Sequence, residues 1–128
     1  MIVAGIGFRR SVAAEDIVAL VEQALERAAL AGDALVKLAT IEALADLPVF
    51  TEAARRLAVP AMSVDQQALS AAAPRVRTQS ARSIAAHGVG SVAEAAALAV
   101  AGPRAELVLD RIASSSATCA LARLETGS

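Results

Sequence analysis

Hydrophobic and polar positions along this chain switch between short apolar runs and helical periodicity. The apolar runs predict buried strands over Ile2–Phe8, Leu35–Ile41 and Ala61–Val64. Between the first two runs, apolar residues recur at helical spacing and charged residues occupy the opposite face, which predicts a helix that stops near Gly32. The apolar face of this helix consists of Ile17, Leu20, Val21, Ala24, Leu25 and Ala28.

The middle of the chain predicts two shorter helices and then an interruption. Pro48 suits the first turn of a helix that runs to Leu57, and Asp65 can cap a brief helix through Ala72. Residues 74–87 break the rhythm, and their first ten residues carry three arginines and no acid. This segment is predicted to be either a mobile surface loop or a binding loop.

The last third predicts one more helix and a pair of strands. Ser91 with Glu94 three residues later has the spacing of a capping box, and Gly102-Pro103 follows the predicted helix. Residues 106–109 and 118–124 are predicted as strands that pair through a serine-rich turn.

Strands and helices alternate over most of the chain, which favours one α/β domain over residues 1–128. The expected architecture is a three-layer α/β/α sandwich with a mostly parallel sheet and a possible C-terminal antiparallel hairpin.

Composition excludes several classes of protein. Of the 128 residues 56% are hydrophobic but only 2% aromatic, which disfavours single-stranded nucleic-acid binding by base stacking. The net charge of -1 also argues against a nucleic-acid partner. The single Cys119 excludes an internal disulfide and a cysteine-rich metal site. No signal peptide or membrane span is apparent, so we expect a cytoplasmic protein without a membrane partner.

Two glycine-bracketed segments carry the candidate binding chemistry. Each leads into a predicted helix, whose first turn offers free N–H groups and a positive dipole end to an anion. The adjacent Arg9 and Arg10 could clamp carboxylates, which their place after a Gly-x-Gly strand favours over a solvated turn or an ion pair with Glu42 or Asp65. The candidate ligand-binding residues are Gly5, Gly7, Phe8, Arg9, Arg10, Ser11, Gly88, Gly90 and Ser91.

The candidate acid/base residues are His87 and Glu42, with Asp65 as a third carboxylate. His87 could also be an axial ligand of a metal-bearing tetrapyrrole, or simply a loop residue beside a glycine turn. The N-terminal Gly-x-Gly lacks the third glycine of a dinucleotide fingerprint, and no G-x-S-x-G elbow is present. No motif calls for a metal or a cofactor.

The order of short motifs resembles the cobalamin-biosynthesis family that comprises CobE and the C-terminal domain of CbiG. The matching motifs are Gly-Ile-Gly-Phe-Arg-Arg at 5–10, Ala-Glu-Asp-Ile at 14–17, Ala-Thr-Ile-Glu at 39–42, Leu-Ala-Val-Pro at 57–60, Gly-Ser-Val-Ala-Glu-Ala-Ala-Ala-Leu at 90–98 and Thr-Cys-Ala-Leu-Ala-Arg at 118–123. This resemblance covers nearly the whole chain. Phe8 stands where many members have cysteine, so a role for that cysteine does not transfer.

The resemblance implies a place in corrin-ring construction and a precorrin or other corrinoid intermediate as ligand. The longer CbiG opens a lactone on a cobalt-corrin intermediate, but this chain has only the size of its C-terminal portion, so lactone opening is not implied. Three functions stay open. They are a binding module for a tetrapyrrole intermediate, a hydrolase or isomerase that acts on one, and an adaptor for another cobalamin-pathway enzyme such as a methyltransferase.

Overall fold

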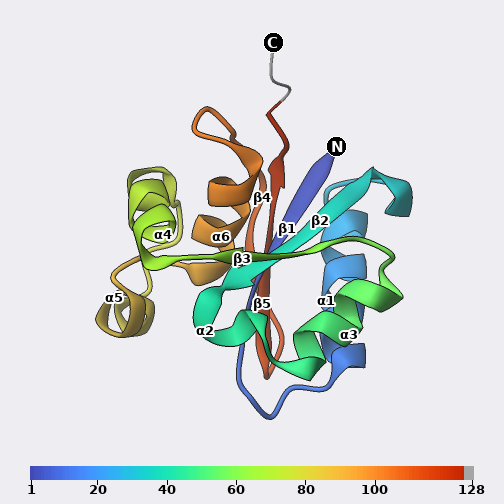
Figure 1. Ribbon diagram of the computed structural model, residues 1–128. Helices are drawn as coiled ribbons and strands as arrows, with labels where there is room; N and C mark the ends of the chain where they lie inside the picture. The colour runs from blue at the N-terminus through green and yellow to red at the C-terminus, as the bar shows by residue number, and fades with distance from the viewer. Residues whose placement is uncertain (126–128) are drawn as a thin grey trace.

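The computed structural model describes residues 1–125 and alternates strands with helices (Figure 1). The strands are β1 (Ile2–Phe8), β2 (Leu35–Ile41), β3 (Ala61–Val64), β4 (Leu107–Ala113) and β5 (Ala117–Arg123). The α-helices are α1 (Ala14–Arg27), α2 (Glu42–Ala45), α3 (Pro48–Arg56), α4 (Gln66–Ala72), α5 (Ala81–His87) and α6 (Val92–Ala101). Two 3-10 turns, η1 (Gly32–Ala34) and η2 (Ala73–Arg75), connect them.

Within these residues the strands form one sheet in the order β3-β2-β1-β5-β4. β1 pairs parallel with β2, and β2 pairs parallel with β3. β5 then runs antiparallel to both β1 and β4, which confirms the C-terminal hairpin. The α/β prediction is confirmed, while the expectation of a mostly parallel sheet holds only for β1, β2 and β3.

Helices cover both faces of the sheet and make three layers. α1 and α3 lie on one face, and α4, α5 and α6 lie on the other (Figure 1). Alternation along β1 sends Ile2, Ala4 and Ile6 into the core beneath α1, and Val3 into the core beneath α6. α6 is buried along most of its length and consists mainly of alanine, so it packs closely on β1.

The ends of β1, β2 and β3 agree with those predicted from the hydrophobic pattern. Two helices were not predicted from the sequence. α2 is a single turn after β2, and α5 occupies residues that were expected to be a loop. α5 has no buried residue, so its sequence lacks the apolar stripe by which helices are recognised. β4 extends to Ala113, beyond the predicted end, because its pairing with β5 continues to the turn.

No single helix in residues 1–125 is long and apolar enough to cross a membrane. Only α5 and α6 taken together are long and apolar enough, and their axes are bent by 62° at the break between them.

The capping box predicted at Ser91 is half formed. The Ser91 hydroxyl accepts a hydrogen bond from the Glu94 N–H at 3.2 Å, as expected of a cap. The Glu94 carboxylate, however, turns away from Ser91 and binds backbone amides of two other segments. Because these amides engage the carboxylate, it does not return to the Ser91 N–H, and this explains the departure from the motif.

Cys119 lies in the central part of β5 with its side chain fully buried. Burial in apolar surroundings raises the pKa of its thiol well above the ordinary range, so the reactive thiolate does not form at neutral pH. We expect Cys119 to resist a maleimide reagent in the folded protein and to react quickly in denaturant. Mass spectrometry over time will measure both rates, and rapid labelling of the folded protein would contradict this burial.

Candidate functional site

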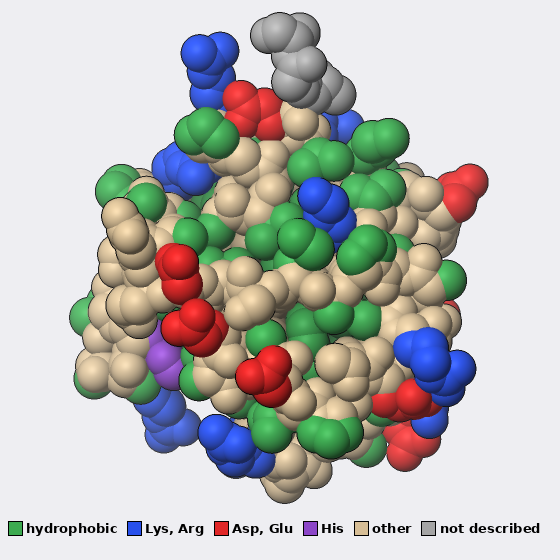
Figure 2. Space-filling model, viewed as in Figure 1, with side chains coloured by type: hydrophobic (Ala, Val, Ile, Leu, Met, Phe, Trp, Pro, Cys, Tyr) green, Lys and Arg blue, Asp and Glu red, His purple; other side chains and the backbone are tan. Residues whose placement is uncertain are grey.

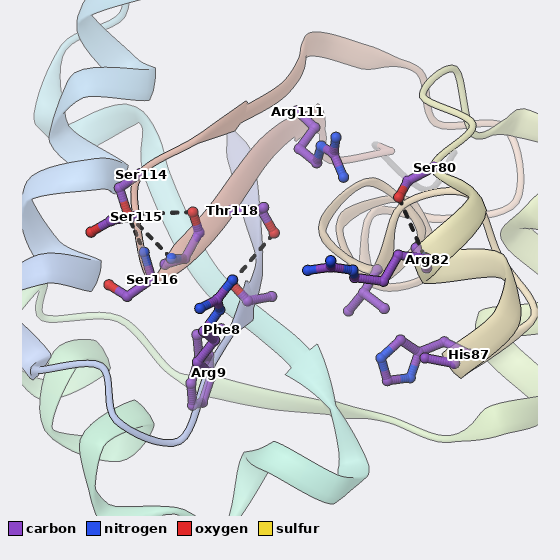
Figure 3. Close-up of a pocket in the computed structure, with 15 residues that line it drawn as sticks. Phe8, Arg9, Ser80, Arg82, His87, Arg111, Ser114, Ser115, Ser116 and Thr118 are labelled. Carbon is purple, nitrogen blue, oxygen red and sulfur yellow. Dashed lines mark hydrogen bonds between the residues drawn. The ribbon is translucent and has the colours of Figure 1, made fainter.

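A cavity of about 330 Å³ opens at the edge of the sheet where β1 ends. Its walls come mainly from three places that are distant in the sequence: the end of β1, helix α5 with its cap, and the β4–β5 hairpin with its serine turn (Figure 3). Val92 at the start of α6 also lines it. Ligands of open α/β sheets bind at the carboxyl ends of parallel strands, and β1 ends at this edge. The hairpin closes the cavity because β5 runs antiparallel to β1 and brings its first residues beside Gly7 and Phe8.

Positive charge dominates the cavity lining. The lining contains three arginines: Arg9 follows β1, Arg82 comes from α5, and Arg111 comes from β4. In Figure 3, Arg82 and His87 project from α5 toward the end of β1 and the hairpin turn. None of the described lining residues is acidic. Figure 2 shows basic side chains immediately below His87, at the lower left of the molecule.

Within residues 1–125, Arg9, Arg82 and Arg111 form no ion pair with an acidic side chain, in contrast to Arg55, Arg56 and Arg77. On α3, side-chain hydrogen bonds from Arg55 and then Arg56 lower the pKa of Glu52 to about 2. The single carboxylate of Glu52 thus offsets one of these two positive charges. The charges of Arg9, Arg82 and Arg111 are left to attract an anion.

Hydroxyl groups form the other part of the lining. The Ser114 Oγ accepts from the Ala117 N–H at 3.2 Å and closes the hairpin turn, and Thr118 Oγ1 donates to the Gly7 carbonyl at 3.3 Å. The Arg9 N–H donates to the Ser116 carbonyl at 3.0 Å, which ties the end of β1 to the same turn. Ser80 and Ser83 line the α5 side. The hydroxyls of Thr118 and Ser83 already donate to the carbonyls of Gly7 and Val89, so the hydroxyls that can donate to carboxylate oxygens are those of Ser80, Ser115 and Ser116.

Of the residues predicted from the N-terminal glycine segment, Gly7, Phe8 and Arg9 line the cavity. Arg10 and Ser11 lie in an exposed turn beside it, outside the lining. Gly5 lies deeper in β1, beneath α6 rather than at the cavity. The Phe8 ring stacks on the buried Phe50 of α3, with centroids 6.1 Å apart and planes 12° apart. This ring therefore braces the end of β1 from the α3 side.

The second glycine segment joins α5 to α6 behind the cavity. Gly88 ends α5 with a left-handed φ of 77°, which favours glycine. Gly90 is buried, and a Cβ there would lie 2.8 Å from the Cα of Gln79. Ser91 is buried as the cap of α6. None of these three residues lines the cavity, but Gly88 and Gly90 hold α5 at its edge, since the Gly88 N–H donates to the Ile84 carbonyl and the Gly90 carbonyl accepts from the Ser80 N–H.

The two candidate acid/base residues meet at a second, neighbouring hollow of about 400 Å³. His87 borders both hollows, while Glu42 borders only the second. Asp65 is used as a cap, since its carboxylate accepts from the Ala68 N–H at 2.8 Å. Residues 1–125 hold no cluster of His, Cys, Asp and Glu side chains suited to a metal ion.

Sequence reasoning missed several lining residues. The arginine-rich segment signalled Arg82, although its neighbours serve the fold: Arg75 donates to the carbonyls of Gly102 and Ala105, and Arg77 pairs with Asp110 at 3.0 Å. Arg111 had no local signal, because only the pairing of β4 with β5 brings it to this edge. The same is true of the Ser114–Ser116 turn.

Comparisons with known proteins agree with one another. The family model described as the cobalamin synthesis G C-terminus matches residues 2–122. Protein CobE from Sinorhizobium sp. is 40% identical over 121 residues, which is 94% of this chain and 79% of that protein. The crystal structure of CobE, from the cobalamin (vitamin B12) biosynthetic pathway, has a TM-score of 0.91 and 36% identity, covering 100% of this chain and 93% of that one. Cobalamin biosynthesis protein chiG from Agrobacterium tumefaciens has a TM-score of 0.75 and 34% identity, covering 98% and 100%.

Proposed function

This chain belongs to the cobalamin synthesis G C-terminus family of cobalamin biosynthesis proteins, and from that premise we propose that it binds a corrin-ring intermediate at the cationic cavity. The ligand is a precorrin or related corrinoid, whose acetate and propionate arms are carboxylates at neutral pH. The observation that carries the proposal is the gathering of Arg9, Arg82 and Arg111 in one lining whose described residues include no acid.

The chemistry of recognition follows from the guanidinium groups. A guanidinium can grip a carboxylate through two parallel hydrogen bonds, and such charge-assisted bonds are stronger than neutral ones. Three arginines from three separate segments suit a ligand that presents several carboxylates at once. The hydroxyls of Ser80, Ser115 and Ser116 supply further donors.

The size of the cavity favours partial enclosure of the ligand. About 330 Å³ lies near the lower end of the range for small-molecule pockets, roughly 300–1,000 Å³. The cavity then receives the carboxylate arms along one edge of the macrocycle, while the rest of the ring stays accessible. This arrangement suits a protein that shields an intermediate and passes it to another pathway protein.

The test is retention of pigment by the purified protein. Each available precorrin intermediate is mixed with the protein and gel-filtered, and the visible spectrum and mass of the pigment in the protein peak are recorded. We expect one intermediate to co-elute unchanged. No retained pigment with any intermediate would contradict the proposal and favour the adaptor function.

An enzymatic function is the second candidate, because His87 borders both the cationic cavity and the hollow that contains Glu42. An imidazole in that place can move protons for a bound substrate. The same experiment separates the two functions, since catalysis changes the spectrum and mass of the retained pigment. A His87→Ala variant that still produces the change would exclude His87 as the acid/base.

A further inference from the structure

We infer that Glu94 is a positioning residue for the cationic cavity, because its buried carboxylate joins the two walls that carry Arg82 and Arg111. This inference rests on the proposed function, since it concerns the same cavity. Glu94 is in the first turn of α6 and fully buried, and it does not itself line the cavity. Its effect on a ligand is therefore indirect, through the backbone that it holds.

The carboxylate accepts four hydrogen bonds from two segments. Its Oε1 receives the N–H groups of Arg77 and Thr78 at 2.7 and 2.9 Å. Its Oε2 receives the Thr78 hydroxyl and, at 2.9 Å, the N–H of Arg111. Burial alone would raise the pKa of Glu94. The hydrogen bonds from the Thr78 hydroxyl and from the three amides together outweigh that effect and lower the pKa, so the carboxylate stays ionised at neutral pH.

The first of the two segments leads directly into α5. Residues 77–79 precede Ser80, the cap of the helix that carries Arg82 and His87. α5 has no buried residue of its own, and even its Ile84 is 46% exposed. Apolar packing therefore does little to place this helix, which depends on polar ties such as the bond from the Ser80 N–H to the Gly90 carbonyl at 2.9 Å.

The second segment is the irregular part of β4. The register between β4 and β5 shifts between Leu109 and Ile112, so the amide of Arg111 lies where regular pairing is interrupted. Glu94 accepts that amide, and the backbone of a cavity arginine is thereby fixed to α6. One carboxylate thus sets the spacing between the wall that holds Arg82 and the wall that holds Arg111.

The test compares Glu94→Gln with Ser91→Ala by amide hydrogen exchange and by ligand binding. Glutamine keeps the size and one carbonyl oxygen, but its NH₂ group cannot accept from Thr78 or Arg111. Ser91→Ala is the matched control, since it removes a cap bond in the same buried turn and leaves both walls tied. Thr78→Val, which removes a single bond to Glu94, is the milder variant should Glu94→Gln fail to fold.

We expect Glu94→Gln to speed exchange in α5 and at Arg111 by about tenfold or more relative to Ser91→Ala. We also expect it to weaken binding of uroporphyrin, a tetrapyrrole with carboxylate arms, by about tenfold under conditions where both variants are folded. Thr78→Val changes both quantities in the same direction by less. Unchanged exchange in α5 and at Arg111 in Glu94→Gln and Thr78→Val would overturn the inference.

The two proposals fail in different ways. If the wild-type protein retains neither uroporphyrin nor any precorrin, the proposed function fails, while hydrogen exchange still decides whether Glu94 ties the two walls. If the wild-type protein binds and Glu94→Gln binds equally well with both walls loosened, the positioning role is wrong and the binding function stands.

Discussion

Replacing Arg9, Arg82 and Arg111 together by alanine is expected to abolish retention of a corrin intermediate by the folded protein. Charge-assisted hydrogen bonds contribute about 1.5–3 kcal/mol each, and the exposure of Arg9 and Arg82 places them toward the lower value. Three such losses weaken binding by roughly three orders of magnitude, since about 1.4 kcal/mol is tenfold. Absorbance titration will measure the affinity, and circular dichroism will verify the fold.

Two single variants serve as controls for this experiment. Arg123→Ala removes the same charge at the opposite end of β5, far from the cavity, and should leave the affinity unchanged. Arg10→Ala removes the neighbour of Arg9, which lies outside the lining, and should weaken binding less than Arg9→Ala. Equal losses in Arg9→Ala and Arg10→Ala would show that the exposed turn, and not the cavity, receives the ligand.

Electrostatic recognition also makes the affinity for the ligand depend on salt concentration. Arg9 and Arg82 are exposed to solvent, so their attraction for carboxylates is screened as ionic strength rises. The affinity of the wild-type protein should fall with added salt, and that dependence should be smaller in the variant without the three arginines. A wild-type affinity that is independent of salt would contradict a binding mode based on these charges.

The central part of the fold was predictable because local patterns of apolar and polar residues determine it. The predominantly apolar runs of β1 and β2 are typical of strands buried on both faces, and the apolar stripe on α1 is typical of a helix that packs on a sheet. Pro48 and Asp65 marked two helix starts correctly. Each of these signals lies within one element and needs no knowledge of its neighbours.

The candidate site was predictable only in part, because long-range pairing assembles it. Arg111 reaches the cavity through the antiparallel pairing of β4 with β5, and Ser114–Ser116 through the turn between them. α5 is placed by hydrogen bonds to Gly90 and Val89 rather than by an apolar stripe. Hydrophobic periodicity carries no information about either arrangement.

Glycine illustrates how one local signal can have two meanings. A glycine in a strand indicates close approach of another group to the backbone, which the sequence reading assigned to a ligand at Gly5 and Gly90. In the structure the approaching group is protein: α6 at Gly5 and the Thr78–Gln79 backbone at Gly90. Gly5 thus allows α6 to pack closely on β1, and Gly90 allows segment 77–79 to pack closely on the α5–α6 turn. Both distances help to place the cavity walls.

Gly5→Ala is accordingly expected to be among the most destabilising single substitutions in this chain. A Cβ at Gly5 would collide with the carbonyl oxygen of Ala93 and lie 2.6 Å from the amide nitrogen of Ala97. Both atoms belong to the backbone of α6, which is buried against β1 and cannot move aside as a flexible side chain would. Overpacking of this kind costs about 3 kcal/mol or more, which lowers Tm by about 10 °C or more in a chain of this length.

Gly32→Ala provides the matched control for this prediction. Gly32 has ordinary φ in a surface turn, and a Cβ there would meet no atom within 4 Å. Its replacement should leave Tm unchanged or raise it slightly, because alanine has less freedom to lose on folding. Calorimetry on the two variants measures the difference directly. A Gly5→Ala variant as stable as Gly32→Ala would mean that α6 does not pack on β1 as closely as the structure has it, and the cavity walls that depend on α6 would then be displaced as well.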